Sequence, residues 1–81
     1  TTVASLRLDC VVSAGYGISR TKASELIKAE KVNVNWDTEM SISRQLKDGD
    51  TISVRGKGRI ILEEVTGNTK KGRIGIVLKK D

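Results

Sequence analysis

The sequence predicts an α+β domain in which two packed N-terminal helices are followed by a small, mainly antiparallel sheet with a C-terminal hairpin. In the first third of the chain, apolar residues recur at helical spacing. From Val32 onward they alternate with polar residues, as on half-buried strands. Turn signals rich in glycine separate the later segments. Because the chain has 81 residues, we expect a single domain over 1–81.

The first helix is predicted from Leu8, Val11 and Val12, which share one face. Gly15 is placed to end this helix in a left-handed conformation, and 15–17 then form a short connector. Cys10 is expected to be a small, partly buried packing residue on the same helix.

The second helix is predicted to begin at Ser19, whose hydroxyl can cap the free N–H groups, with Ile18 and Ala23 packed over this end. Ala23, Leu26 and Ile27 then face inward. This orientation leaves one flank that holds no acid and consists of Arg20, Ser24, Lys28 and Lys31. Arg20 also lies at the helix N-terminus, which favours anions. The flank therefore suits phosphate, although a merely solvated helix face remains the alternative.

The sheet is predicted to start where Val32, Val34 and Trp36 alternate with asparagines. The alternation makes Trp36 a lid on the core rather than a platform for base stacking. Residues 37–45 are interpreted as a loop with a weak strand around Ile42.

Residues 48–50 predict an exposed turn, in which Asp48 and Asp50 form the turn rather than a catalytic pair. A strand follows over 51–55, with Ile52 and Val54 inward. The last two strands are expected at about 59–65 and 73–78, joined across 67–69.

The charge is distributed unevenly along the chain. The net charge is +5, with five cations against three acids in 1–31, two against four in 32–54, and eight against two in 55–80. Both ends are therefore basic, which favours a polyanionic partner.

Several classes of site are excluded. With no histidine and one cysteine, the chain has no internal disulfide, no zinc site and no catalytic nucleophile–base pair. The glycines of 67–72 have phosphate-loop spacing, but Arg73-Ile74 replaces the required Lys-Ser/Thr, and 56–58 favours a basic turn over a cofactor box. We expect no enzyme activity, metal, cofactor or small-molecule substrate. No apolar run approaches membrane-helix length and no signal peptide is present, so we expect a cytoplasmic protein without a membrane partner.

The kind of nucleic acid is indicated by the side chains. Proteins that bind along a single strand stack its bases on aromatic side chains, and Tyr16 and Trp36 are too few for this mode of binding. The flank of Arg, Ser, Lys and Lys suits phosphates better than base edges. Structured RNA is the best fit, although helix-turn-helix DNA binders also have basic second helices.

A family resemblance rests on ordered motifs: Arg7-Leu8-Asp9, Ser19-Arg20 with Ala23 and Leu26-Ile27, Val32 with Val34-Asn35, and Gly49-Asp50 with Ile52. Over roughly residues 6 to 55 the chain resembles the S-four RNA-binding domain, named after the fourth protein of the small ribosomal subunit. Two positions, Glu30 and Trp36, depart from the family pattern. Glu30 stands where a glycine usually ends the helix. Trp36 replaces the glycine after Asn35, which argues against a tight hairpin turn there.

Within that family, Trp36 and the tail that begins at 54–59 resemble the carboxy-terminal domain of YlmH-like proteins, which are encoded beside cell-division genes in many bacteria. The resemblance implies a core over about 6–55, a basic hairpin extension over 56–80, and a longer protein of which this chain is the C-terminal part. It also implies ribosomal RNA or tRNA as the partner, the large ribosomal subunit as a further one, and a role in translation.

The candidate RNA-binding residues form two groups. The helix pair contributes Arg7, taken from the family pattern, with Arg20, Lys22, Lys28 and Lys31. The C-terminal extension contributes one cluster at its start, Arg55, Lys57 and Arg59, and one near its far turn, Lys70, Lys71 and Arg73. Through these clusters we expect one face of the sheet edge to carry a second positive patch. Two alternatives stay open: a protein-interaction module whose hairpin docks an acidic partner, and an RNA-targeting appendage of an RNA-modifying enzyme.

Overall fold

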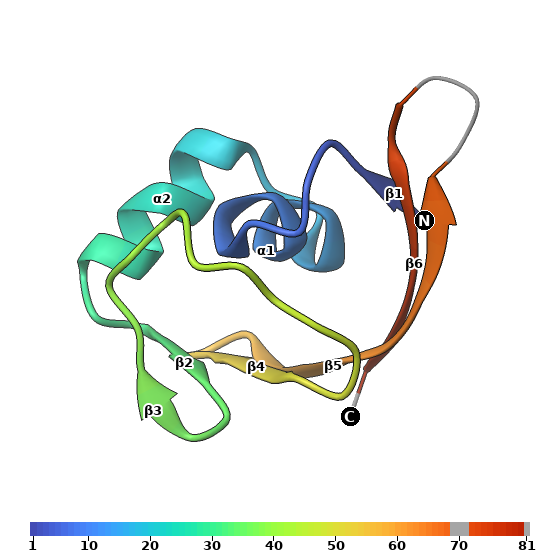
Figure 1. Ribbon diagram of the computed structural model, residues 1–81. Coiled ribbons are helices and arrows are strands. Elements are labelled where there is room, and N and C mark those ends of the chain that lie inside the picture. Colours follow the sequence, from blue (N-terminus) through green and yellow to red (C-terminus); the bar gives the residue numbers. More distant parts are fainter. Residues whose placement is uncertain (69–71, 81) are drawn as a thin grey trace.

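The computed structural model describes residues 1–68 and 72–80 and has two layers, with both helices over one face of a six-stranded sheet (Figure 1). The strand order is β1-β6-β5-β4-β2-β3, and all neighbours pair antiparallel. The elements are β1 (Thr2–Val3), α1 (Leu8–Tyr16), α2 (Arg20–Lys28), β2 (Val32–Val34), β3 (Asp37–Thr38), β4 (Thr51–Val54), β5 (Gly58–Asn68) and β6 (Ile74–Lys80). The predicted α+β class is confirmed.

The helix α1 buries the face that its sequence predicts but ends later than expected. Leu8, Val11 and Val12 are fully buried. The left-handed residue is Gly17, with a φ of 66°, so Gly15 does not end the helix. Gly15 instead lies where α1 crosses β5, and a β-carbon there would collide with the side chain of Ile60. The absent side chain thus lets the two layers approach.

The helix α2 is capped at both ends by local contacts. At its start the Lys22 N–H donates to Ser19 Oγ at 3.1 Å, as predicted. At its end Glu30 has a φ of 62°, its N–H donates to Ile27 O, and the Lys31 N–H donates to Leu26 O. This is a Schellman motif. Glu30 therefore adopts the left-handed conformation usual for glycine, at a strain of about 1 kcal/mol.

The turn between β2 and β3 corrects two expectations about Trp36. Val34 pairs with Asp37, which leaves Asn35 and Trp36 as a two-residue turn with φ values of 51° and 74°. Two positive φ values are typical of a tight type I′ hairpin, so a glycine is not required here. Because Trp36 lies in the turn rather than on the strand, its side chain leaves the core and the residue is 65% exposed.

Asp50 is a structural anchor rather than an exposed turn residue, because it is only 3% exposed. Its carboxylate accepts hydrogen bonds from Asn35 Nδ2 and the Lys47 N–H, both at 3.0 Å. The Asn35 amide oxygen in turn accepts from the Thr51 N–H at 3.0 Å. The expectation of an unburied carboxylate is wrong, and the β2–β3 turn is fastened to the start of β4.

The loop between β3 and β4 crosses the N-terminus of α1. No strand forms around Ile42 in the described chain, contrary to expectation. Its carbonyl accepts the Asp9 N–H at 3.2 Å, and the Leu8 N–H donates to Arg44 O at 2.9 Å. These bonds satisfy donors that the first turn of a helix leaves unpaired.

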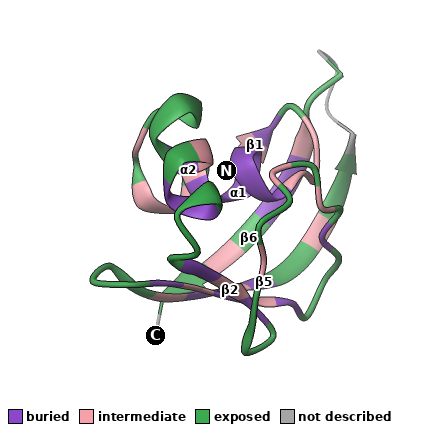
Figure 2. Ribbon diagram, turned by 90° about the vertical axis from the view of Figure 1, so that its left-hand side faces the viewer, coloured by how far each residue is buried: buried purple, intermediate pink, exposed green. Residues whose placement is uncertain are grey.

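The core lies between the layers, where buried residues of both helices meet those of the central strands (Figure 2). Ala23, Leu26 and Ile27 of α2 are buried, as predicted, and so are Ile52 and Val54 of β4. The last two strands are longer than expected, since Gly67 and Asn68 still pair with β6. Thr69, the third residue of the predicted turn, lies outside the described residues. None of the helices in 1–68 and 72–80 has the length and hydropathy to cross a membrane.

Candidate nucleic-acid interface

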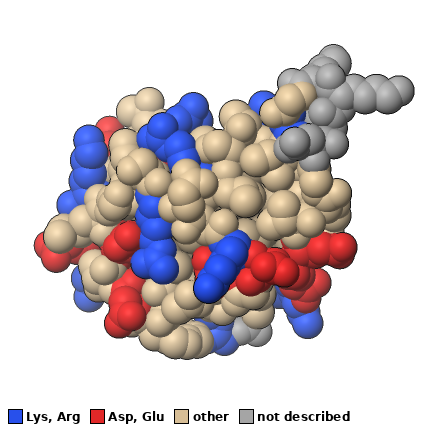
Figure 3. Space-filling model, viewed as in Figure 1, with Lys and Arg blue, Asp and Glu red and all other residues tan. Residues whose placement is uncertain are grey.

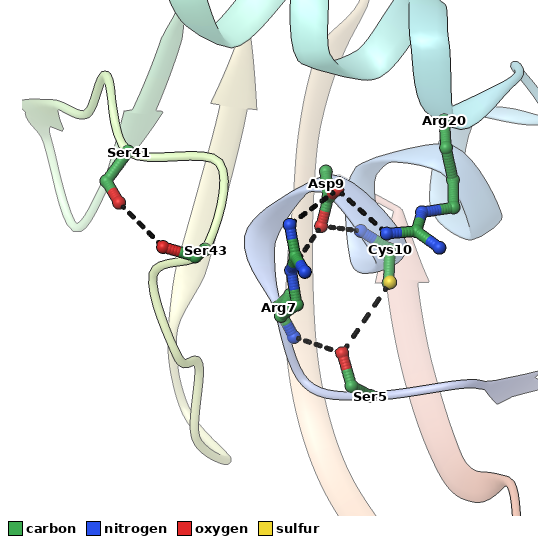
Figure 4. A network of polar contacts seen from close by, with 7 residues as sticks. All are labelled: Ser5, Arg7, Asp9, Cys10, Arg20, Ser41 and Ser43. Carbon is green, nitrogen blue, oxygen red and sulfur yellow. Dashed lines mark hydrogen bonds and ion pairs between the residues drawn. The ribbon is translucent and has the colours of Figure 1, made fainter.

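Asp9 holds two arginines from different parts of the fold (Figure 4). It lies in the first turn of α1 and is 2% exposed. Arg7 Nε lies 3.2 Å from Asp9 Oδ1, and Arg20 Nη2 lies 3.2 Å from Asp9 Oδ2. The Cys10 N–H also donates to Oδ1, at 2.9 Å. One buried carboxylate thus orients a pair of guanidinium groups at the junction of the helices.

This pair carries an excess positive charge toward solvent. The side chain of Arg7 is 35% exposed and that of Arg20 is 56% exposed, whereas that of Asp9 is almost inaccessible. The hydrogen bond to Asp9 raises the pKa of Arg20, so this guanidinium stays charged. A guanidinium with free N–H groups binds phosphate oxygens through its planar fork. The expectation that the flank contains no acid holds for α2, but Asp9 of α1 supplies one.

The remaining cations of the helices are exposed. In the described ranges, no ion pair involves Lys22, Lys28 or Lys31. Figure 3 shows lysine and arginine side chains spread over the helical part of one face, while acidic side chains lie mainly toward the sheet. We call the five residues Arg7, Arg20, Lys22, Lys28 and Lys31 the helix patch.

The described cations of the C-terminal extension lie at the two ends of the hairpin formed by β5 and β6. Arg55 and Lys57 are exposed in the β4–β5 turn, and the Arg59 guanidinium lies over the Trp36 ring at 5.0 Å from its centroid. Arg73 lies beyond the other end of β5, a strand whose length of eleven residues corresponds to about 30 Å. Arg55, Lys57 and Arg59 therefore lie far from Arg73, at the opposite end of the hairpin. Lys70 and Lys71 lie outside the described residues.

Arg73 instead joins the side of the molecule that carries Arg20. Its Nε donates to Thr2 Oγ1 at 3.0 Å and its Nη2 donates to Thr2 O at 3.1 Å. Both arginines line a groove of about 410 Å³ between β1 and α1. Arg20 and Arg73, which are 53 positions apart in the sequence, thus belong to one basic surface. The sequence pattern alone does not predict that these two arginines lie on the same side of the molecule.

The described residues show no arrangement suited to metal chemistry. Nowhere in 1–68 and 72–80 do three histidine, cysteine or acidic side chains gather as metal ligands would. The surface that stands out is instead built from cations, two of which are oriented by Asp9. Such a surface can bind an extended anion by charge and hydrogen bonding.

Comparison with known proteins gives matches at the level of sequence. The chain is 38% identical over 79 residues to the ribosome-associated protein quality control protein P2 of Bacillus subtilis, covering 98% of this chain and 31% of that protein. It is 41% identical over 54 residues to the small ribosomal subunit protein uS4 of Chromohalobacter salexigens, covering 65% of this chain and 26% of that protein. The chain therefore spans about a third or less of these relatives.

Solved structures share the fold. A crystal structure of a pseudouridylate synthase aligns with a TM-score of 0.62 and 28% identity over 75% of this chain and 25% of that one. The structure of Vibrio cholerae Heat Shock Protein 15 aligns with a TM-score of 0.63 and 21% identity over 95% of this chain and 83% of that one, which shows the fold alone.

The family assignment follows from these matches. The sequence pattern of the S4 domain matches residues 6–52, which include both helices, the Arg7-Leu8-Asp9 motif and the strands β2 and β3. The match to the Bacillus subtilis protein continues past this segment through nearly the whole chain. The resemblance to the S-four family that the motifs indicate is thus confirmed, and the chain belongs to the S4 domain family.

Proposed function

We propose that this chain is a non-catalytic RNA-binding module whose helix patch binds the phosphates of structured RNA. The observation that carries the proposal is the guanidinium pair of Arg7 and Arg20, oriented by the buried carboxylate of Asp9. A pair fixed before binding loses less side-chain entropy when it meets phosphates. The exposed side chains of Lys22 and Lys28 add charge along α2, and Lys31 adds charge just past the end of this helix.

The relatives support RNA of the translation machinery as the partner. One is named for its association with the ribosome, one is a small ribosomal subunit protein, and one similar structure is a pseudouridylate synthase. From these we infer ribosomal RNA or tRNA as the ligand, with the large ribosomal subunit as a partner of the whole protein. Cytoplasmic localisation follows from that assignment.

The pseudouridylate synthase also bears on catalysis. The alignment covers only 25% of that chain, so the shared segment is a minor part of the enzyme. We infer that a module of this kind contributes RNA binding, while any chemistry belongs to other parts of a longer protein. The role of an RNA-targeting appendage is thus compatible with this function.

The decisive variant reverses the charge of Lys22 and Lys28 together. Lys22→Glu/Lys28→Glu changes two exposed lysines without ion pairs, whereas a glutamate at position 20 would place a second carboxylate beside Asp9. We expect binding to a transfer RNA, measured by fluorescence anisotropy, to weaken at least 10-fold with an unchanged circular dichroism spectrum.

The matched control is Lys79→Glu/Lys80→Glu, which makes the same charge change on exposed lysines at the end of β6. It should weaken binding much less. An equal loss in both double variants would mean that net charge, not the helix patch, governs affinity. A protein-docking function would gain support if neither pair affected RNA binding.

A further inference from the structure

The face of the sheet that points away from the helices carries a row of polar side chains. Thr38 pairs with Asn33, Asn33 with Ser53, and Ser53 with Arg59, so one row crosses β3, β2, β4 and β5. Directly paired side chains of antiparallel strands point to the same face. The alternate residues, such as Val54, point into the core. The row is therefore on the outer face.

A groove of about 530 Å³ lies along this row and has cations at one end. Asn33, Thr38 and Ser53 line it, together with Lys31 and Arg55. The Arg55 N–H donates to Lys31 O at 2.8 Å, which holds these two positions side by side. Glu30 is the single acid of the lining, so the groove has a net positive charge. Its size falls within the range of about 300–1,000 Å³ that is typical of ligand sites.

Trp36 lies beside the polar row, because it contacts Arg59, which pairs with the groove residue Ser53. Arg59 belongs to the polar row, and its guanidinium lies over the Trp36 ring at 5.0 Å from the centroid. The indole nevertheless leaves a large surface accessible, since Trp36 is 65% exposed. The turn that carries it is held by the bonds of Asn35 to Asp50 and Thr51. Trp36 is thus an exposed aromatic on a fixed backbone.

We propose that this groove and Trp36 beside it together bind one unpaired RNA nucleotide, with its phosphate between Lys31 and Arg55 and its base stacked on Trp36. The amide of Asn33 and the hydroxyls of Thr38 and Ser53 supply donors and acceptors for the ribose and the base edge. Only an unpaired base presents its face for stacking. One indole takes one base, so the site does not follow a strand.

The proposal rests on the proposed function and extends it. Lys31 belongs both to the helix patch and to the groove. A stem that lies along α2 therefore ends close to the groove, where a nucleotide bulged from it can reach Trp36. The preferred substrate is an RNA stem with an adjoining unpaired nucleotide, rather than a continuous duplex.

The test uses Trp36 as a reporter, because it is the only tryptophan of the chain. Two RNA stem-loops of identical sequence are compared, one with a single bulged adenosine and one without. We expect the bulged RNA to quench Trp36 fluorescence strongly and to bind about 5- to 150-fold more tightly, the range of one base–aromatic stack. Trp36→Ala should abolish this preference, as measured by anisotropy with labelled RNA, and leave binding of the unbulged stem unchanged.

Met40→Ala is the matched control, because Met40 is also an exposed apolar residue, at 58%, and follows β3 at the end opposite to Trp36. It should keep the preference. If both stems bind equally and leave the fluorescence unchanged, the groove proposal is overturned while the proposed function stands. If neither stem binds, both the groove proposal and the proposed function are overturned. A fluorescence change with a polyglutamate peptide but with neither RNA would assign the groove to an acidic protein.

Discussion

Replacing Asp9 by asparagine separates the orientation of the guanidinium pair from simple charge attraction. Asparagine has the same size and keeps an oxygen to accept the Cys10 N–H, but it loses the charge that holds Arg7 and Arg20. The substitution also raises the net charge by one unit. If attraction between a basic protein and RNA were the whole account, Asp9→Asn would bind RNA more tightly. Our account predicts weaker binding.

The magnitude follows from the number of side chains that are released. Immobilising one long side chain on binding weakens affinity by about 2- to 10-fold. Since Asp9 orients two arginines, we expect Asp9→Asn to weaken RNA binding by about 5- to 100-fold. Loss of the charge-assisted contact with Arg7, whose Nε is buried, should also cost about 1–2 kcal/mol of stability. For a domain of this size that is a fall in Tm of about 4–16 °C.

The assay is fluorescence anisotropy with a labelled transfer RNA, at a temperature where circular dichroism shows that the variant is folded. Asp48→Asn is the matched control, because Asp48 is an exposed turn residue without an ion pair in the described chain. It makes the same change of charge and should bind RNA as tightly as the wild type or slightly better. Equal or tighter binding by Asp9→Asn would refute the role of orientation.

Two further predictions concern the fold. Glu30→Gly should stabilise the protein by about 0.5–1 kcal/mol in urea denaturation, because glycine relieves the strain at a φ of 62°, and a loss of stability would contradict the Schellman assignment. Burial raises the pKa of Tyr16, whose hydroxyl donates to Gly58 O at 2.8 Å. The folded state therefore keeps the phenol proton to higher pH than the unfolded chain, and stability should fall as pH rises above about 10. Ultraviolet titration of this single tyrosine checks the shift, and Tyr16→Phe should lose that part of the pH dependence.

Much of the fold could be predicted because short-range periodicity reports burial directly. Leu8, Val11 and Val12 at helical spacing, and Ile52 and Val54 at strand spacing, are all buried. The cap of α2 was equally visible, because Ser19 needs only its own helix to be satisfied.

The wrong predictions concern residues whose place is set by an unusual backbone conformation or by a contact with a residue distant in the sequence. Alternation placed Trp36 in the core, but the chain leaves the strand one residue earlier, when Asn35 takes a positive φ that non-glycine residues seldom adopt. The sequence predicts that Gly15 ends the helix, whereas its role comes from contact with Ile60 on a strand far along the chain.

The candidate site also combines features that the sequence predicts with features that only the fold reveals. Exposed cations of α2 could be found by placing the apolar residues inward, since that argument needs one helix only. The role of Asp9 could not, because it depends on how α1 and α2 lie against each other. The motif Arg7-Leu8-Asp9 contains the signal, but only the fold brings Arg20 to the same carboxylate.

The salt dependence of RNA affinity tests the central claim most directly, because contacts with phosphates release counterions from the RNA. Binding of a transfer RNA is titrated at several salt concentrations for the wild type and for Lys22→Glu/Lys28→Glu. We expect a slope of log Kobs against log salt of about −3 to −6 for the wild type, and a slope less steep by about two for the variant. A wild-type slope near zero, or the same slope in both proteins, would contradict phosphate binding by the helix patch.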